Sequence, residues 1–327
     1  IQRTNRRHRL FSQGDGIVIG LSGGPDSTAL FLLLVKLQKK YRLRLAAAHL
    51  NHSLSPKDSL KFEKFSENLA NRLHVPFFKK KLNLRLFAKK NKKTLEEAGR
   101  LARYELFKEI AAKVGAAKIA TAHTLDDQAE TVLMRIGRGT GLKGLSGIPV
   151  KRKEGRYEII RPLLGISKAE ILASLKRSKE PYCLDISNQS DQFTRNRVRN
   201  KLLPWLEKNL NPQIKISLSE LAGICSENQA HLEKISLATL KDCLLHKNKR
   251  SLSLDTARLG CLDGAVLSET LFAALTLLKN KRVRFGASHI AAIRALIESP
   301  ENRKQTHLPG SVTAVKEKGA LRIFDTS

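Results

Sequence analysis

The sequence predicts an α/β protein with a doubly wound parallel sheet, followed by a smaller C-terminal α+β domain. Short apolar runs alternate with helical segments throughout the first half of the 327 residues, which is typical of a parallel sheet with helices on both faces. Polar residues gather where successive predicted strands end, the edge at which such sheets bind ligands. The pattern changes near residue 212, which predicts two domains, residues 1–212 and 213–327.

The elements of the first half follow from periodicity. Short runs rich in apolar residues predict strands over 16–21, 43–50, 75–82 and 117–123. Apolar residues recurring with a helical period predict helices over 26–40, 58–73 and 94–115 and from about residue 126. A loop rich in Gly and Lys is expected over 137–155, followed by one further unit.

The second half has a different organisation. A long helix rich in Leu and Ile is expected over about 212–245. Two further helices and two short strands are expected over 263–279, 288–298, 312–315 and 320–324.

The charge balance indicates a polyanionic partner. The chain has 60 Lys and Arg against 30 Asp and Glu, a formal net charge of +30. Self-repulsion of this size favours nucleic acid as the partner and an anionic membrane surface as the second candidate; a generally basic composition is the alternative. Only 5% of the residues are aromatic, which argues against binding by an aromatic stacking platform.

The cysteines and the hydropathy pattern favour a cytoplasmic protein. The four cysteines, none at CxxC spacing, are Cys183, Cys225, Cys243 and Cys261. This spacing argues against a zinc ribbon, a redox pair or a disulfide scaffold. No apolar run approaches the roughly 18 residues of a membrane span, so no membrane-spanning segment is expected.

The first predicted strand ends at a motif suited to phosphate. Residues 22–27 read SGGPDS. Glycines let backbone N–H groups turn towards an anion, and the N-terminus of the following helix adds a positive dipole. The stretch is neither GxGxxG nor the GxxxxGK[ST] loop, because no Lys follows. A tight turn with Asp26 as a helix cap is the alternative.

This motif after a first parallel strand resembles that of the PP-loop ATP pyrophosphatases, with their adenine nucleotide α hydrolase-like fold. The resemblance implies that ATP is cleaved between its α and β phosphates and that an oxygen is adenylated. It also implies that Asp26 faces the ATP phosphates together with Mg²⁺, as carboxylates do with hard cations.

Further stretches, spanning most of residues 16–210, resemble the tRNA(Ile)-lysidine synthetases. They are HLNHSLS at 49–55, LEEAGRLARYELF at 95–107, ATAHTLDDQAETVLMRIGRGTGLKGLSGI at 120–148, RPLLGISKAEI at 161–171 and DISNQSDQFTRNRVRNKLLP at 185–204. Ser55 stands where the family usually has Arg, and Thr124 where a second His often follows the first.

The resemblance implies a reaction with two steps. ATP adenylates the C2 carbonyl oxygen of cytidine 34 in the CAU anticodon of tRNA(Ile), and free L-lysine then displaces AMP to give lysidine. The decoding changes from AUG to AUA. The implied partners are this tRNA and free lysine, with no membrane and no stable protein partner.

It also implies roles for individual residues. The loop around the pyrophosphate comprises Ser22, Gly23, Gly24, Pro25, Asp26 and Ser27, and Ala48 and His49 lie beside the adenine. Arg103 and His123 contact phosphate or cytidine as charge builds on oxygen. Asp127 ligates the metal together with Asp26, or recognises the lysine amine. Arg195 reaches the nucleotide or the RNA, with Arg197 and Arg199 as neighbours.

Each role has a structural alternative. Arg100 and Arg103 could pair with Glu96 and Glu97 on a helix surface, and His123 could be a core histidine. For Asp126 the preferred interpretation is a helix N-cap, which leaves Asp127 as the functional acid. The arginines near 195 could form a solvated, phosphate-contacting face.

Three other functions fit the sequence less well. A PP-loop tRNA thiolase needs a persulfide-carrying or cluster-binding cysteine, and the ATP domain has Cys183 alone. An NAD or GMP synthetase does not explain the charge of +30. A non-catalytic RNA-binding protein on the same fold does not explain why Asp26, His123 and Asp127 are all present.

Basic clusters predict where RNA docks. They lie in the loop region at Lys143, Lys151, Arg152 and Lys153, and in the tail at Lys247, Lys249, Arg250, Lys279, Lys281, Arg282 and Arg284. Contacts of this kind supply affinity and orientation, so the tail is expected to be a tRNA-binding accessory domain.

Overall fold

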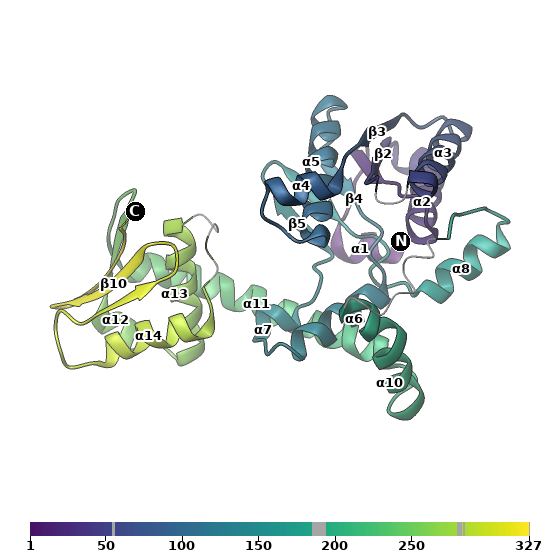
Figure 1. Cartoon of the computed structure of the whole chain (residues 1–327). Coiled ribbons are helices and arrows are strands. Elements are labelled where there is room, and N and C mark those ends of the chain that lie inside the picture. Colours follow the sequence, from purple (N-terminus) through teal and green to yellow (C-terminus); the bar gives the residue numbers. More distant parts are fainter. Residues whose placement is uncertain (54–55, 185–193, 280–282, 284, 327) are drawn as a thin grey trace. The chain divides into compact units, whose positions relative to one another are not determined.

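The chain forms two compact units, Ile1–Ile224 and Cys225–Ser327 (Figure 1). The computed structural model describes residues 1–53, 56–184, 194–279, 283 and 285–326. The division lies later than the expected boundary at 212/213, because helix α11 runs unbroken over Ile214–Cys243. Leu218 and Ala222 of this helix share a small hydrophobic core with α6 (Leu125–Ile136), so the start of α11 belongs to the first unit.

The first unit is built on a six-stranded sheet in the order β3-β2-β1-β4-β6-β5. Five strands pair in parallel and only β5 runs antiparallel. The strands are β1 (Gly16–Gly20), β2 (Arg44–Asn51), β3 (Phe77–Lys81), β4 (Lys118–Ala120), β5 (Lys151–Glu154) and β6 (Tyr157–Ile160). The parallel, doubly wound sheet predicted from the sequence is confirmed. The edge strand β5 was expected to be loop.

Alternate residues of β1 enter two different hydrophobic cores, because successive side chains of a strand point to opposite faces. Ile17 and Ile19 pack in the core that contains α2 (Pro25–Tyr41), α8 (Lys168–Arg177) and part of α3 (Pro56–Arg72). Val18 packs on the other face with α5 (Leu95–Lys113). Helices therefore cover both faces of the sheet (Figure 1).

Gly20 explains how closely α5 approaches β1. A Cβ atom at Gly20 would lie 2.6 Å from the ring of Phe107. Only glycine therefore fits at the last residue of the strand that leads into the SGGPDS loop.

The remaining helical elements of this unit are short and connect or flank the main ones. They are α1 (Gln2–His8), α4 (Leu84–Lys90), α7 (Leu142–Leu145), α9 (Thr194–Arg197), the π-helix η2 (Val198–Leu202) and α10 (Leu203–Asn209).

The second unit has a five-stranded antiparallel sheet in the order β7-β8-β11-β10-β9, with α12 (Thr256–Gly260), α13 (Gly264–Lys279) and α14 (Ala287–Glu298). Its strands are β7 (Leu244–Lys247), β8 (Ser251–Asp255), β9 (Gln305–Leu308), β10 (Val312–Glu317) and β11 (Ala320–Asp325). The α+β class is confirmed, although only β10 and β11 were expected among the strands. In the described part of the chain, no helix is long and apolar enough to cross a membrane.

Candidate functional site

The SGGPDS loop connects β1 to α2 at the carboxyl edge of the parallel sheet. Gly23 has φ +87°, and a Cβ there would lie 3.2 Å from Ser66 Oγ and from the Phe62 carbonyl oxygen on α3. The loop is therefore seated tightly on α3. The helix has Gly24 as its N-cap, with no capping side chain. Backbone N–H groups at the first turn of α2 are thus left for an anion.

The two serine hydroxyls of the loop are linked to each other. Ser22 Oγ and Ser27 Oγ lie 3.0 Å apart, and the Ser22 N–H donates to Ser27 Oγ at 3.1 Å. Ser27 Oγ in turn donates to the Gly24 carbonyl at 3.0 Å. This pre-formed turn holds both hydroxyls beside the start of α2, as a phosphate cradle requires.

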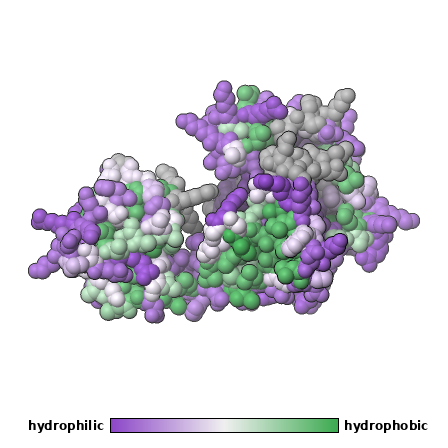
Figure 2. All heavy atoms as spheres, turned by 60° about the horizontal axis from the view of Figure 1, so that its bottom comes forward, coloured by the Kyte–Doolittle hydropathy of each residue, from purple (hydrophilic) through white to green (hydrophobic). Residues whose placement is uncertain are grey.

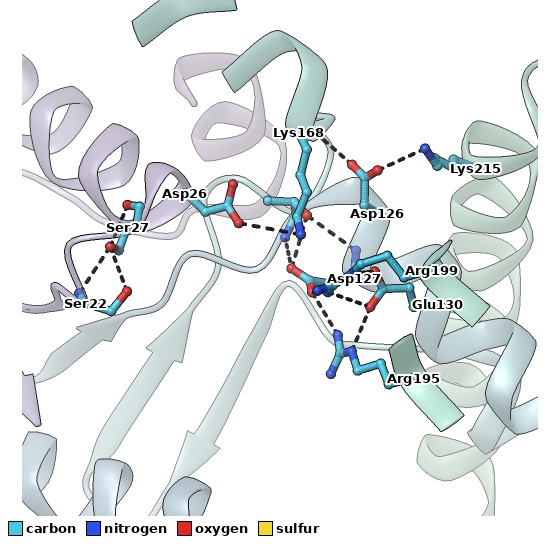
Figure 3. A network of polar contacts seen from close by, with 12 residues as sticks. Ser22, Asp26, Ser27, Asp126, Asp127, Glu130, Lys168, Arg195, Arg199 and Lys215 are labelled. Atoms are coloured by element: carbon cyan, nitrogen blue, oxygen red, sulfur yellow. Dashed lines mark hydrogen bonds and ion pairs between the residues drawn. The ribbon is translucent and has the colours of Figure 1, made fainter. Parts of the chain in front are cut away.

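Asp26 points away from the serines, towards Lys168 (Figure 3). Its Oδ1 atom is buried and has no hydrogen-bond partner, and its Oδ2 atom lies 4.0 Å from Lys168 Nζ. Burial raises the pKa of Asp26 to about 6, although Lys168 acts in the opposite direction. A buried oxygen without a hydrogen-bond partner destabilises the fold unless a ligand supplies that partner.

Asp127 belongs to the start of α6, beyond the end of β4. Thr124 is the N-cap, and Asp127 Oδ2 accepts hydrogen bonds from its N–H at 2.9 Å and its hydroxyl at 3.1 Å. The other carboxylate oxygen, Oδ1, accepts a hydrogen bond from Arg195 Nη2 at 2.8 Å. Desolvation works to raise the pKa of Asp127, but Arg195 and these hydrogen bonds outweigh it and hold the pKa below its usual value.

The interpretation of Asp126 as the helix N-cap is wrong. The helix begins at Leu125, so the N3 position of the capping box is occupied by Asp127. Asp126 instead accepts a hydrogen bond from the Lys168 N–H at 2.7 Å and forms an ion pair with Lys215 at 3.0 Å. Its role is to bind α8 and α11 to α6. Thr124 is the N-cap of this helix.

Glu130 lies one turn further along α6, and its side chain is completely buried. It accepts a hydrogen bond from Arg195 Nε at 2.7 Å and two from Arg199, at 2.6 and 3.0 Å. Figure 3 shows both arginines converging on this helix. The two arginines come from α9 and η2, so the Glu130 carboxylate docks that segment beside Asp127.

His123 lies just beyond the end of β4. Its Nδ1 atom lies 3.0 Å from Thr121 Oγ1. Burial, and then the charge of Arg161, lower the pKa of His123 to about 3. The imidazole is therefore neutral near pH 7, when it offers one hydrogen-bond donor and one acceptor.

The end of β2 lies beside β1. Ala48 is buried, and its carbonyl accepts a hydrogen bond from the Leu21 N–H at 2.9 Å. His49 Nδ1 lies 2.8 Å from the Leu21 carbonyl. His52 Nδ1 is buried with no partner, and burial lowers the pKa of this imidazole to about 4. Ser55 lies outside the described residues.

Arg103 and Arg100 lie on α5, and the structure gives neither an ion pair with Glu96 or Glu97. The guanidinium of Arg100 instead lies over the ring of Tyr104, 5.1 Å from its centroid. Arg103 is exposed and close enough to His52 for its charge to lower the pKa of that histidine further. Glu97 is engaged in the capping box of α5.

The residues present fit one Mg²⁺ ion shared with phosphate oxygens. Among the described residues no group of three or more His, Cys, Asp or Glu side chains can hold a metal. Mg²⁺ is commonly held by one or two carboxylates together with substrate phosphates, and Asp26 Oδ1 is buried without a partner. Both oxygens of Asp127 accept protein hydrogen bonds, so its metal role stays a prediction.

The basic clusters are largely exposed. Lys143, Lys151, Lys153, Lys247, Lys249 and Arg250 are exposed. Arg152 is exposed but paired with Glu154, and Lys279 is paired with Asp325 at 2.5 Å. Lys281, Arg282 and Arg284 lie outside the described residues, as does the stretch 185–193 of the DISNQSDQFTRNRVRNKLLP motif.

Sequence reasoning missed Glu130 and Lys168. Glu130 follows Asp127 by three residues, a spacing that places both side chains on one face of a helix, so this signal was available. Lys168 is separated from Asp26 by more than 140 residues in the chain, and only the folded structure brings them together.

Comparisons with known proteins indicate the family of the chain. The family described as the PP-loop domain matches residues 2–206. The chain is 33% identical over 330 residues to the tRNA(Ile)-lysidine synthase of Clostridioides difficile (strain 630), covering 97% of this chain and 68% of that protein. It is 35% identical over 319 residues to the tRNA(Ile)-lysidine synthase of Geobacter sulfurreducens, covering 97% and 66%.

A solved structure shows the same fold. The U34-tRNA thiolase NcsA from Methanococcus maripaludis superposes with a TM-score of 0.57 at 20% identity. The likeness covers 69% of this chain and 79% of that one. At this identity it supports the fold alone.

Proposed function

We propose that this chain, which belongs to the tRNA(Ile)-lysidine synthase family, joins free lysine to C2 of cytidine 34 in the CAU anticodon of tRNA(Ile). ATP is converted to AMP and diphosphate. The observation that carries this proposal is the site itself: a phosphate loop with the unpartnered Asp26 oxygen faces the cluster of Asp127, Glu130 and Arg195. The chain is about two thirds as long as these relatives.

In the first step the C2 carbonyl oxygen of cytidine attacks the α-phosphorus of ATP. An oxygen–phosphorus bond forms, and the bond to diphosphate breaks. Ser22, Ser27 and the N–H groups of α2 bind the departing diphosphate, and Asp26 is the residue that would hold Mg²⁺. When bound, this ion neutralises phosphate charge. Ala48 and His49 line the adenine side, as expected from their place at the end of β2.

His123 and Arg103 lie where charge develops on the cytidine and phosphate. The neutral imidazole orients an oxygen by donating one hydrogen bond, and the guanidinium of Arg103 supplies positive charge. Arg103 forms no ion pair with Glu96 or Glu97, so these two carboxylates do not neutralise its charge.

In the second step the lysine ε-amine attacks C2, the bond between C2 and the AMP oxygen breaks, and one amine proton is released. The amine must be neutral at attack, although it is protonated in water near pH 7. Asp127 binds the ammonium before attack. Arg195 then holds Asp127 in place through its contact of 2.8 Å.

The thiolase alternative is disfavoured by the cysteines. Cys183 is the single cysteine among residues 1–224. It is buried, and burial raises the pKa of its thiol. A reactive cysteine needs the opposite, a lowered pKa and access to substrate.

The test measures diphosphate release from ATP with an unmodified tRNA(Ile) transcript that carries the CAU anticodon. Release should require this transcript, and mass spectrometry of the RNA digest should detect lysidine only when lysine is added. A transcript with uridine at position 34 is the matched control and should be inactive. The proposal would be contradicted if the modified nucleoside formed equally well without added lysine, or if sulfur were transferred to the RNA.

A further inference from the structure

A second, exposed face of the segment that carries Arg195 has no role in this chemistry. An open hollow with a volume of about 480 Å³ lies on α9, η2 and α10. Its lining residues are Thr194, Arg197, Val198, Lys201, Leu202 and Trp205. Their spacing of three and four residues places them on one helical face.

The π-helix η2 lies in the middle of this segment. Arg195 and Arg199 turn inward to Glu130, whereas Arg197 and Lys201 are exposed at the hollow. Single π-turns are rare and frequently occur at functional sites. The same short segment therefore contacts the candidate site on one side and presents cations on the other.

Trp205 is the only tryptophan of the chain, and 59% of it is exposed. Leu202 beside it is 42% exposed. Figure 2 shows hydrophobic side chains gathered on this part of the first unit, around α6, α10 and the start of α11. An exposed indole flanked by two cations suits a nucleobase and its phosphate, because every base has a face that can stack.

We propose that this hollow binds one unpaired nucleotide of the tRNA, with the base stacked on Trp205 and the phosphate contacted by Arg197 and Lys201. The proposal rests on the proposed function, which requires a single-stranded anticodon loop at the neighbouring site. The hollow would hold a nucleotide next to the target cytidine in the same loop. One exposed indole provides a single stacking position rather than an extended platform.

The charge of the hollow favours RNA over a second copy of this chain. Its lining contains two cations and, among the described residues, no acid. A second copy would bring two such cationic faces together, because symmetric dimers use the same patch on both subunits.

The single tryptophan allows a direct test, because its emission reports on this hollow alone. The full chain is titrated with an RNA stem-loop carrying the CAU anticodon while tryptophan fluorescence is recorded. We expect saturable quenching that weakens as salt rises. Unchanged emission at an RNA concentration that saturates binding, measured independently by anisotropy of a labelled stem-loop, would overturn the proposal.

Substitutions separate stacking from simple apolar contact. Trp205→Ala and Trp205→Leu should weaken binding of the labelled stem-loop about tenfold, whereas Trp205→Phe should retain most of the affinity. Arg197→Ala with Lys201→Ala should also weaken binding and reduce its salt dependence. Lys89→Ala with Lys90→Ala, two exposed lysines of α4, is the matched control and should change binding little. Full affinity of Trp205→Leu would overturn the stacking role.

Self-association is the competing outcome. If light scattering gives a dimer mass that Trp205→Ala abolishes, and emission changes with protein concentration in the absence of RNA, the hollow is an interface between copies and the proposal is wrong. Failure of the proposed function is distinguishable: quenching by the stem-loop without lysine-dependent product would leave the subsite intact.

Discussion

Asp26 is the residue whose environment most directly links structure to activity. Its carboxyl group is buried at the start of α2, with one oxygen unpartnered. Burial disfavours the charged form, which is why its pKa is raised to about 6. Binding of Mg²⁺ with ATP requires the charged form.

We therefore predict that affinity for ATP with Mg²⁺ falls as pH decreases through about 6, approaching tenfold per pH unit below it. The proton must leave Asp26 before the carboxylate can hold the ion, which sets the direction. Calorimetric titration between pH 5 and 8 measures this. Asp26→Asn should bind ATP with Mg²⁺ weakly, and its affinity should no longer change near pH 6. Ser22→Ala should retain this pH dependence. A step that persists in Asp26→Asn would assign the titration to another group.

The same pKa makes a prediction for stability. The folded state holds its proton more tightly than the unfolded state, so the free energy of unfolding decreases as pH rises from about 4 to about 6 and this contribution is constant above. Asp26→Asn should accordingly raise the free energy of unfolding at pH 7.5 by about 2 kcal/mol, with little gain at pH 4. Urea denaturation at the two pH values tests it. If Asp26→Asn changed the free energy of unfolding equally at both pH values, the charged Asp26 carboxylate would not destabilise the folded state.

Asp127 has a different environment, since its pKa is held low by Arg195 and by the cap of α6. We predict that Asp127→Asn impairs the lysine step more than adenylation. Adenylated tRNA should accumulate, and the lysine concentration needed for half-maximal rate should rise about tenfold or more, as expected when one charge-assisted contact is lost. Rapid-quench analysis with labelled ATP distinguishes the steps. Loss of the adenylate with unchanged lysine dependence would place Asp127 at the metal.

At the scale of elements, the buried Glu130 carboxylate organises α6, α9 and η2. Two arginines satisfy it, and removing the charge leaves both guanidinium groups without their main acceptor. Because these arginines are partly exposed, 31% and 26%, the cost is smaller than for a fully buried pair.

We predict that Glu130→Gln lowers the free energy of unfolding by about 2 kcal/mol and reduces the rate of diphosphate release. Thermal unfolding and the release assay measure the two effects. Glu96→Gln, at an exposed position on α5, is the control and should change neither. If Glu130→Gln kept full stability, the arginines would be held by other contacts.

At the scale of the whole molecule, the helix α11 decides where the catalytic unit ends. Leu218 and Ala222 pack on Ala129 and Val132 of α6, and Lys215 pairs with Asp126 at 3.0 Å. A chain ending at residue 212 lacks all of these contacts. One ending at residue 224 keeps them.

We predict that the chain 1–224 binds ATP and unfolds at a temperature at least 5 °C above that of the chain 1–212, because burying two apolar side chains contributes a few kcal/mol. Both should bind tRNA more weakly than the full chain, with a flatter salt dependence. Calorimetry and filter binding at several salt concentrations test this. Equal stability of the two chains would favour the boundary at 212, and undiminished tRNA affinity would argue against a docking role for the second unit.

The class of the fold, the alternation of strands and helices along the first half of the chain, and the phosphate loop could all be predicted from the sequence. These features are local, because glycines, turn residues and the spacing of apolar residues act on neighbouring parts of the chain. The loop Ser22–Ser27 could therefore be identified without any knowledge of the fold. Which distant side chains share the site could be learned only from the folded chain. Lys168 meets Asp26, and Arg199 meets Glu130 across 69 residues of chain, because sheet order and the docking of α9 set those distances. The raised pKa of Asp26 likewise depends on burial, which no local pattern specifies.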